Sequence, residues 1–309
     1  MFSIIVPIYN EEASLPELYK RIVAVMDTTG DPWEFVMVDD GSVDNSAQMI
    51  LDYAEKDERV KPVIFARNFG HQIAVTAGLD YCRGQAVVII DADLQDPPEV
   101  ILELIEQWRA GYEVVYAVRE TRQGESWFKL TTAKLFYRAI NKITAINIPL
   151  DTGDFRLMDR KVVNVMNQMR EHHRFLRGMS AWIGFKQTGV KYQRAARFAG
   201  ETHYPLKKML KLAVTAITGF SFWPLQVAMY LGFFASGLST LAIPVVVIMR
   251  LMGNQAFFGQ ATTLIAVLFL GGVQLISLGI LGEYIGRLYD EARGRPLYIV
   301  RQAPGKDSD

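Results

Sequence analysis

The stretch VVIIDADLQDPPE, residues 87–99, places three carboxylates within six positions directly after an apolar run. Asp91, Asp93 and Asp96 would repel one another if they stood bare at the end of a buried strand. Two hard oxygen ligands in such a place suit Mg²⁺ or Mn²⁺, which keep open positions for phosphate oxygens. The spacing of Asp91 and Asp93 therefore predicts a divalent-metal site that is shared with a phosphorylated ligand.

The acidic stretch does not fit the pattern of a calcium-binding loop, although a solvated turn remains compatible with it. A calcium-binding loop beginning at Asp91 would need Gly at its sixth position and Glu at its twelfth, where the chain has Asp96 and Leu102. A solvated turn remains an alternative, with Asp96 capping the helix that follows the two prolines. The chain has no G-x-G-x-x-G after its first apolar run and no G-x-x-x-x-G-K-[ST], which argues against a dinucleotide oxidoreductase and a P-loop NTPase.

The elements that must position these carboxylates alternate over the first two-thirds of the chain. Short apolar runs predict buried strands at 3–8, 34–39, 61–65, 86–91 and 113–118. Amphipathic stretches predict helices at about 13–27, 44–56, 70–81 and 98–110. This alternation predicts an α/β domain whose mostly parallel sheet is covered by helices on both faces. Such sheets bind ligands at the carboxyl ends of their strands, where the clusters YNEE, DDGS, ARNFGH and DADLQD fall.

Composition narrows the class of protein further. The formal net charge of zero over 309 residues argues against a general nucleic-acid binder. A single cysteine, Cys82, excludes an internal disulfide framework and any metal site built from several cysteines. The opening MFSIIVPIYNEE has only a short apolar run with no basic segment before it, and this favours a strand over a signal peptide.

Two long uncharged segments occupy the last third of the chain. Residues 213–249 and 251–282 contain no charged side chain, whereas a spanning helix needs only about 20 residues. A buried core hairpin would keep a polar face, which these segments lack. They predict membrane spans near 225–248 and 262–283. Lysines and arginines flank the pair and only Arg250 lies between, so the positive-inside rule predicts that both termini and the α/β domain are cytoplasmic.

Two further segments have the pattern of helices at a membrane interface. Residues 205–224 are basic near their start, with lysines at 207, 208 and 211, and then become apolar. In 127–143, Lys134, Arg138 and Lys142 recur every four residues beside an apolar face. A solvated helix face is the usual origin of such a basic stripe. Beside two spans, a helix that lies in the interface and meets anionic lipid is an equally good interpretation.

The motifs, taken in their order, resemble a known group of enzymes. VPIYNEE, VDDGS, DADLQDPPE and DTGDFRLM occur in succession, followed by RAARFAGET, the two apolar segments and LGEYIGR. The chain resembles family 2 inverting glycosyltransferases of the GT-A fold, of the polyprenyl-phosphate type. That type includes bactoprenol glucosyltransferases, which look nearer, and dolichyl-phosphate mannose synthase. The resemblance covers essentially the whole chain, and the set of motifs is more specific than any single one.

The resemblance implies roles for particular residues. Those implied to form the nucleotide pocket are Pro7, Tyr9, Glu11, Asp39 and Asp91, with Asp39 facing the uracil or ribose. Those implied to hold the metal and the diphosphate are Asp91, Asp93 and Gln95. Those expected to bind the acceptor phosphate are Arg119, Arg122 and Arg197, to which the basic stripe adds Lys134 and Arg138. The catalytic residues would be Asp93 and Asp154.

Asp154 matches the acidic residue that lies near the acceptor and the sugar in this family, where it is conventionally assigned as a base. A phosphate monoester has a second pKa of about 6, so the acceptor phosphate is already largely dianionic at pH 7. A strong general base is then hardly required. We expect Asp154 to orient the acceptor or the sugar, and the role of general base is the alternative.

The implied reaction moves glucose from UDP-glucose to undecaprenyl phosphate, with Mg²⁺ or Mn²⁺ as cofactor, and gives the β-linked lipid product and UDP. Alternatives are another sugar, from GDP-mannose or a UDP-aminoarabinose derivative, or a non-catalytic adaptor or flippase subunit. The expected organisation is a catalytic domain at 1–204, an interfacial helix at 205–224, a membrane hairpin at 225–286 and a cytoplasmic tail at 287–309. The chain would lie in a bacterial inner membrane, and its sequence leaves open whether it forms a homo-oligomer.

Overall fold

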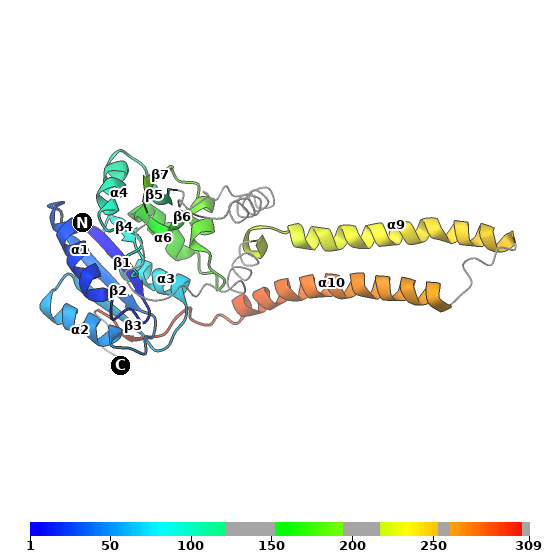
Figure 1. Ribbon diagram of the computed structural model, residues 1–309, viewed down its shortest axis with the longest axis horizontal. Helices are drawn as coiled ribbons and strands as arrows, with labels where there is room; N and C mark the ends of the chain where they lie inside the picture. The colour runs from blue at the N-terminus through cyan, green and yellow to red at the C-terminus, as the bar shows by residue number, and fades with distance from the viewer. Residues whose placement is uncertain (121–151, 194–216, 253–259, 305–309) are drawn as a thin grey trace. The chain divides into compact units, whose positions relative to one another are not determined.

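The computed structural model describes residues 1–120, 152–193, 217–252 and 260–304 (Figure 1). The chain divides into two compact units, one made of Met1–Ala216 with Pro296–Asp309 and one made of Ile217–Arg295. The basic stripe at 127–143 and most of the interfacial helix predicted at 205–224 lie outside the described residues.

The first unit is built on a mixed sheet with the described strand order β7-β5-β6-β4-β1-β2-β3-β8. Strands β1 to β4 are mutually parallel at its centre, β6 runs antiparallel to β4 and β5, and β8 runs antiparallel to β3. The strands are β1 Phe2–Ile8, β2 Trp33–Asp39, β3 Val60–Phe65, β4 Ala86–Ile89, β5 Val114–Arg119, β6 Thr152–Asp159, β7 Gln187–Tyr192 and β8 Val300–Gln302. All seven residues of β1 and of β2 are buried, as central strands require.

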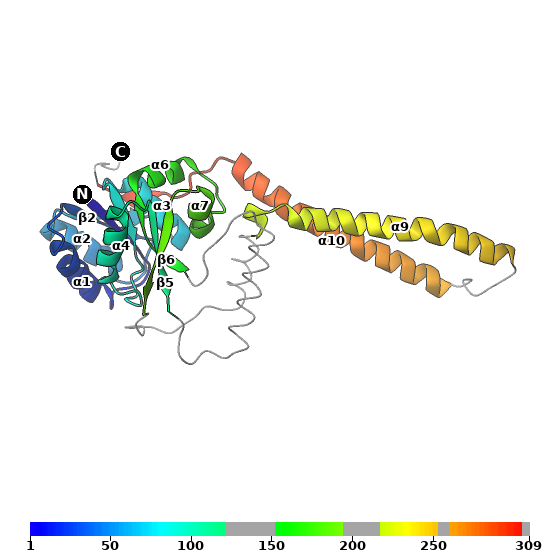
Figure 2. The same cartoon turned by 90° about the horizontal axis from the view of Figure 1, so that it is seen from above.

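Helices cover both faces of this sheet (Figure 2). Ile4 and Val6 of β1 belong to a core that includes residues of α1 Leu15–Asp27, α2 Ser46–Lys56 and α4 Val100–Arg109. Side chains alternate along a strand, so Ile5 points to the other face. There it packs against α3 His71–Tyr81, where a Cβ on Gly78 would approach Cγ2 of Ile5 to 2.2 Å. Helices α6 Arg160–Gln168 and α7 Leu176–Trp182 follow β6, and α6 packs on α3.

The sequence predicted β1 to β5 and α1 to α4 with ends that differ from the structure by a few residues. It did not predict β6, β7 or β8, nor helices α6 and α7. The C-terminal segment was expected to be a tail from residue 287. In the structure α10 continues to Ala292, and the segment from Pro296 belongs to the first unit, where it supplies β8.

The second unit is a pair of long apolar helices, α9 Trp223–Leu251 and α10 Gln260–Ala292, which pack side by side in both views (Figures 1 and 2). Segments Trp223–Met249 and Ala266–Ala292 are long and apolar enough to cross a membrane, with 6% and 0% of their most apolar windows buried. At their base the Tyr284 hydroxyl donates a hydrogen bond of 2.7 Å to the Ser221 carbonyl. The two predicted apolar helices are therefore confirmed.

Candidate active site

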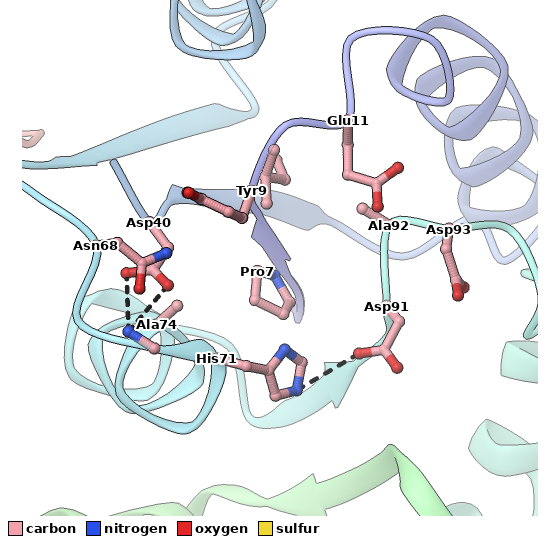
Figure 3. A pocket seen from close by; sticks show the side chains of 12 residues that line it. Pro7, Tyr9, Glu11, Asp40, Asn68, His71, Ala74, Asp91, Ala92 and Asp93 are labelled. Atoms are coloured by element: carbon pink, nitrogen blue, oxygen red, sulfur yellow. Dashed lines mark hydrogen bonds and ion pairs between the residues drawn. The ribbon is translucent and has the colours of Figure 1, made fainter. Parts of the chain in front are cut away.

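A cavity of about 450 Å³ opens at the carboxyl ends of β1, β2, β3 and β4 (Figure 3). Five of the residues predicted for the nucleotide and metal site line it, and these are Pro7, Tyr9, Glu11, Asp91 and Asp93. Glu11, Asp91 and Asp93 lie on one side of the cavity, opposite Asp40. The carboxyl ends of the parallel strands meet at one edge of the sheet, so residues that are far apart in the sequence line the same cavity.

The acidic loop after β4 presents a carboxylate that is costly to leave ionised. The Oδ1 atom of Asp91 is buried and accepts no hydrogen bond from any described residue. Burial, together with nearby carboxylates and against the pull of His71, raises the pKa of Asp91 to about 6. The turn is closed by the Gln95 N–H, which donates to Oδ1 of Asp93 at 3.1 Å. Leu94 adopts φ = 56°, a strained conformation for Leu that the burial of its side chain offsets.

Asp154 lies on β6 with its side chain only 7% exposed, and three side chains bind its carboxylate. Arg177 Nε donates to Oδ1 at 2.8 Å, and its Nη2 lies 3.4 Å from Oδ2. Gln72 Nε2 donates to Oδ2 at 3.1 Å, while its Oε1 accepts the Leu176 N–H. Burial alone would raise the pKa of Asp154, but Arg177 and His71 hold it well below its usual value. Asp154 is therefore an ionised, firmly oriented carboxylate.

His71 connects the two acidic sites, because its Nε2 lies 3.2 Å from Oδ2 of Asp154 and 3.6 Å from Oδ1 of Asp91. Burial opposes its protonation, yet the two carboxylates prevail and raise the pKa of His71 to about 9. An imidazolium between two carboxylates offsets their repulsion. His71 is the first residue of α3 and follows Gly70, whose φ of 101° favours glycine.

The adjacent residues Asp39 and Asp40 have different partners and lie differently relative to the cavity. Asp39 was predicted to face the nucleotide, but its carboxylate is buried and accepts the N–H of Ser42 at 3.2 Å. The described lining of the cavity includes Asp40 and not Asp39. The carboxylate of Asp40 accepts the N–H groups of Phe69 at 2.7 Å and Gly70 at 3.0 Å, which fixes the loop after β3. The sequence did not single out Asp40.

Asp96 has a structural partner that the sequence did not indicate. The alternative in which Asp96 caps the following helix does not hold, since α4 begins at Val100 with Glu99 at its N-cap. Asp96 is instead fully buried, where it accepts a hydrogen bond from the Tyr192 hydroxyl and lies 3.6 Å from Nη2 of Arg119. Arg119, predicted to bind the acceptor phosphate, keeps 28% of its side chain exposed beside this pair.

Some predicted site residues cannot be compared with the structure. Arg122, Lys134, Arg138 and Arg197 lie outside the described residues. Gln95 is described, and it contributes its backbone N–H to Asp93 rather than a side chain to the cavity lining. His71, Gln72 and Arg177 were missed, although the cluster ARNFGH after the third strand had drawn attention to the position of the first.

Comparison with known proteins agrees with this geometry. Residues 3–166 match Glycosyl transferase family 2, and residues 223–288 match the family described as GtrB C-terminal hairpin. The first match covers more than half of the chain and includes β1 to β6 with the residues of the cavity. The chain belongs to glycosyltransferase family 2, and it is therefore a transferase.

Relatives are similar over nearly the full length. An uncharacterized glycosyltransferase, YkcC, of Bacillus subtilis (strain 168) is 52% identical over 98% of this chain and 94% of its own. The SfII prophage-derived bactoprenol glucosyl transferase of Shigella flexneri is 42% identical over 97% of both chains. Among solved structures, glucosyl-3-phosphoglycerate synthase from Mycobacterium tuberculosis, in complex with Mn²⁺, UDP-glucose and phosphoglyceric acid, is 18% identical with a TM-score of 0.48, over 71% of this chain and 77% of that one.

These findings confirm the family resemblance and the predicted fold class. The first unit is a family 2 domain of the GT-A fold with a mixed, mostly parallel sheet. The second unit matches the family described as GtrB C-terminal hairpin and consists of two helices that could span a bilayer. The chain is accordingly a membrane-associated transferase.

Proposed function

We propose that this chain transfers glucose from UDP-glucose to a polyprenyl phosphate, undecaprenyl phosphate in a bacterium, with inversion and release of UDP. Relatives named bactoprenol glucosyl transferase, 40–42% identical over nearly the whole chain, support the sugar and the class of lipid. The observation that carries the proposal is the acidic wall of the cavity, formed by Glu11, Asp91 and Asp93, in a chain that also holds an apolar hairpin. A non-catalytic adaptor would have no use for three carboxylates gathered on one side of a cavity, one of which, Asp91, is buried with a raised pKa.

The acidic wall fits a Mg²⁺ or Mn²⁺ ion that is shared with the diphosphate of the donor. The buried Oδ1 of Asp91 accepts no hydrogen bond from the described residues, and a cation bound there would also lower the raised pKa of this carboxyl. The described residues contain no group of three His, Cys, Asp or Glu that could hold an ion unaided. A metal that takes further ligands from phosphate and water needs only one or two carboxylates, which Asp91 and Asp93 provide. When bound, it would stabilise the charge that develops on the leaving diphosphate.

The reaction breaks the bond between C1 of glucose and the β-phosphate oxygen of UDP, and it forms a bond between C1 and an oxygen of the acceptor phosphate. Attack from the face opposite UDP converts the α-linked donor into a β-linked product. The acceptor attacks as a dianion, so no proton has to be removed. The negative charge it brings is balanced by the charge that leaves with UDP.

In this scheme Asp154 orients a reactant and does not serve as a base. A carboxylate whose pKa lies well below the usual range is a weak proton acceptor at neutral pH. Arg177, His71 and Gln72 fix both of its oxygens, which suits a group that must hold a sugar hydroxyl or the acceptor in one place. Arg119 is proposed to meet the acceptor phosphate with its exposed part, together with Arg122, Lys134, Arg138 and Arg197.

The proposed location is a bacterial inner membrane, with the catalytic domain and both termini in the cytoplasm. The polyprenyl chain of the acceptor would stay in the bilayer, and the apolar hairpin would keep the enzyme at the same membrane. Support for the topology comes from β8, because Val300–Gln302 follows the hairpin and yet pairs with β3 of the catalytic unit. Basic residues on both flanks of the hairpin agree with a cytoplasmic location.

Purified full-length protein, supplied with undecaprenyl phosphate and Mg²⁺, provides the test. Radiolabelled UDP-glucose, UDP-galactose and GDP-mannose are compared for label that enters the lipid phase. We expect label from UDP-glucose with the parent and none with Asp93→Asn. Transfer should be unchanged in the control Asp52→Asn, whose carboxylate accepts an exposed hydrogen bond from Gln48. Preferential transfer from another donor would reassign the sugar, and no lipid-soluble label from any donor would refute the proposal.

A further inference from the structure

The segment that follows α10 does more than end the chain, because it returns to the sheet of the catalytic unit. Strand β8 pairs antiparallel with the end of β3, with Phe65 opposite Val300. One residue further, the Ala66 N–H donates to the Ile299 carbonyl at 2.9 Å. Ala66 is the first residue of the loop between β3 and α3, so the C-terminal segment holds the beginning of that loop.

Tyr298 joins the two elements on either side of the same loop. Its ring stacks on Phe65 at the end of β3, with ring centroids 5.1 Å apart and planes 15° apart. Its hydroxyl donates a hydrogen bond of 2.7 Å to Oδ2 of Asp80 on α3, and Asp80 is in turn paired with Arg170 at 2.8 Å. Burial of the ring, and then this hydrogen bond to the carboxylate, raise the pKa of Tyr298, so the phenol stays protonated.

The loop between these elements forms part of the donor cavity. Asn68, Gly70 and His71 line it. Phe69 stands edge-on to Phe65, with centroids 5.6 Å apart, so a row of three rings runs from Tyr298 through Phe65 to Phe69. The N–H groups of Phe69 and Gly70 donate to Asp40, which also lines the cavity. The Asp40 carboxylate therefore holds one end of the loop, and the C-terminal segment holds the other end.

We infer that Tyr298 is a positioning residue for the nucleotide-sugar pocket, and that the segment after the hairpin holds the loop at 66–70 in its binding conformation. The inference deepens the proposed function, since it names a residue on which donor affinity depends. Tyr298 does not line the cavity, so it acts through Phe65 and Phe69. Aromatic contacts of this kind correspond to roughly two- to tenfold in an equilibrium constant.

Three variants of the full-length protein separate the ring, the hydroxyl and a general effect of mutating the segment. Tyr298→Ala removes the stacked ring, and Tyr298→Phe keeps the ring and loses the bond to Asp80. Ile299→Ala is the matched control, because the Ile299 side chain is 55% exposed and its carbonyl, which binds Ala66, is retained. Amide hydrogen exchange of the peptide spanning 66–71 reports on the loop, and UDP affinity with Mg²⁺ and the KM for the acceptor report on the sites.

For Tyr298→Ala we expect exchange at 66–71 to rise about tenfold and UDP to bind about five- to tenfold more weakly, with the acceptor KM within about twofold of the parent. In Tyr298→Phe the loop exchange and the UDP affinity should both lie much closer to the parent values than in Tyr298→Ala. Ile299→Ala should match the parent. Unchanged loop exchange, faster exchange throughout the domain, or unchanged UDP affinity would each overturn the inference. If the parent transfers no glucose to lipid, the proposed function fails, and loop exchange with UDP affinity still decides the inference.

Discussion

Replacing Arg177 by alanine tests whether the carboxylate of Asp154 is held by a buried ion pair. The substitution removes both contacts from the guanidinium, 2.8 Å to Oδ1 and 3.4 Å to Oδ2. His71 and Gln72 still approach Oδ2, but Oδ1 loses the charged partner of a side chain that is only 7% exposed in the parent. The buried charge of Asp154 is then balanced only in part, by the His71 imidazolium that it shares with Asp91.

The expected cost follows from this geometry. Breaking a buried pair by removing one partner costs about 3–5 kcal/mol. We expect about 3 kcal/mol, because the remaining ligands and water at the partly exposed position of Arg177 replace some of the lost stabilisation. In a domain of roughly 200 residues this lowers the melting temperature by about 6–12 °C. Adding Asp154→Asn removes the stranded charge, so the double variant should recover most of the stability, with a coupling of about 2 kcal/mol.

The assay is thermal unfolding of the full-length protein in detergent, followed by intrinsic tryptophan fluorescence, with transfer activity measured in parallel. Arg109→Ala is the control, since Arg109 pairs with Asp31 at 2.6 Å but both side chains are more than a third exposed. Such surface pairs contribute at most about 1 kcal/mol. Activity of Arg177→Ala should fall by about a hundredfold, because Asp154 loses its orientation. Equal melting temperatures for Arg177→Ala and the control Arg109→Ala would refute the buried-pair reasoning. Strictly additive effects of Arg177→Ala and Asp154→Asn in the double variant would also refute it.

Three other predictions concern the metal, the base and the topology. Asp91→Asn and Asp93→Asn should each lower transfer at least about a hundredfold with the fold intact, and a chelator should abolish activity that Mg²⁺ or Mn²⁺ restores; insensitivity to chelation would contradict the metal site. The kcat of Asp154→Asn relative to the parent should be about constant from pH 6 to 8.5 with acceptor saturating, whereas a ratio that climbs toward one would reinstate the general base. Reporter fusions at Asp309 and near Gln255 should give opposite readings, and equal readings would exclude two spans.

The parts of the fold that the sequence predicted are those whose apolar pattern is uninterrupted. Strands β1 to β5 are short apolar runs, and the helices between them have one apolar stripe, so local patterning is enough. Strand β6 was missed because its TGDFRLMD carries Asp154 and Arg156, both buried. Those charges are accommodated by Arg177 and Ser180 of α7, which are distant in sequence, and no periodicity of the strand itself reveals this.

The site was predictable to the extent that it depends on strand ends. Tyr9, Glu11, Asp91 and Asp93 follow strands, and the carboxyl ends of parallel strands meet at one edge. Arg177 was not predictable in this way, because it reaches Asp154 from a helix that the sequence did not indicate. Its position depends on tertiary packing and not on any local motif.

The pairing of β8 with β3 also bears on how the hairpin can sit in a membrane. Chain segments before and after α9 and α10 contribute to one sheet, since β3 precedes the hairpin and β8 follows it. If the hairpin crossed a bilayer an odd number of times, Val300 would lie on the opposite side from Phe65 and these strands could not pair. For the two described helices, two crossings or none keep this part of the sheet intact, whereas a single crossing does not. Because both helices are apolar enough to span and are hardly buried within the protein, two crossings satisfy the sheet and the hydrophobic effect together.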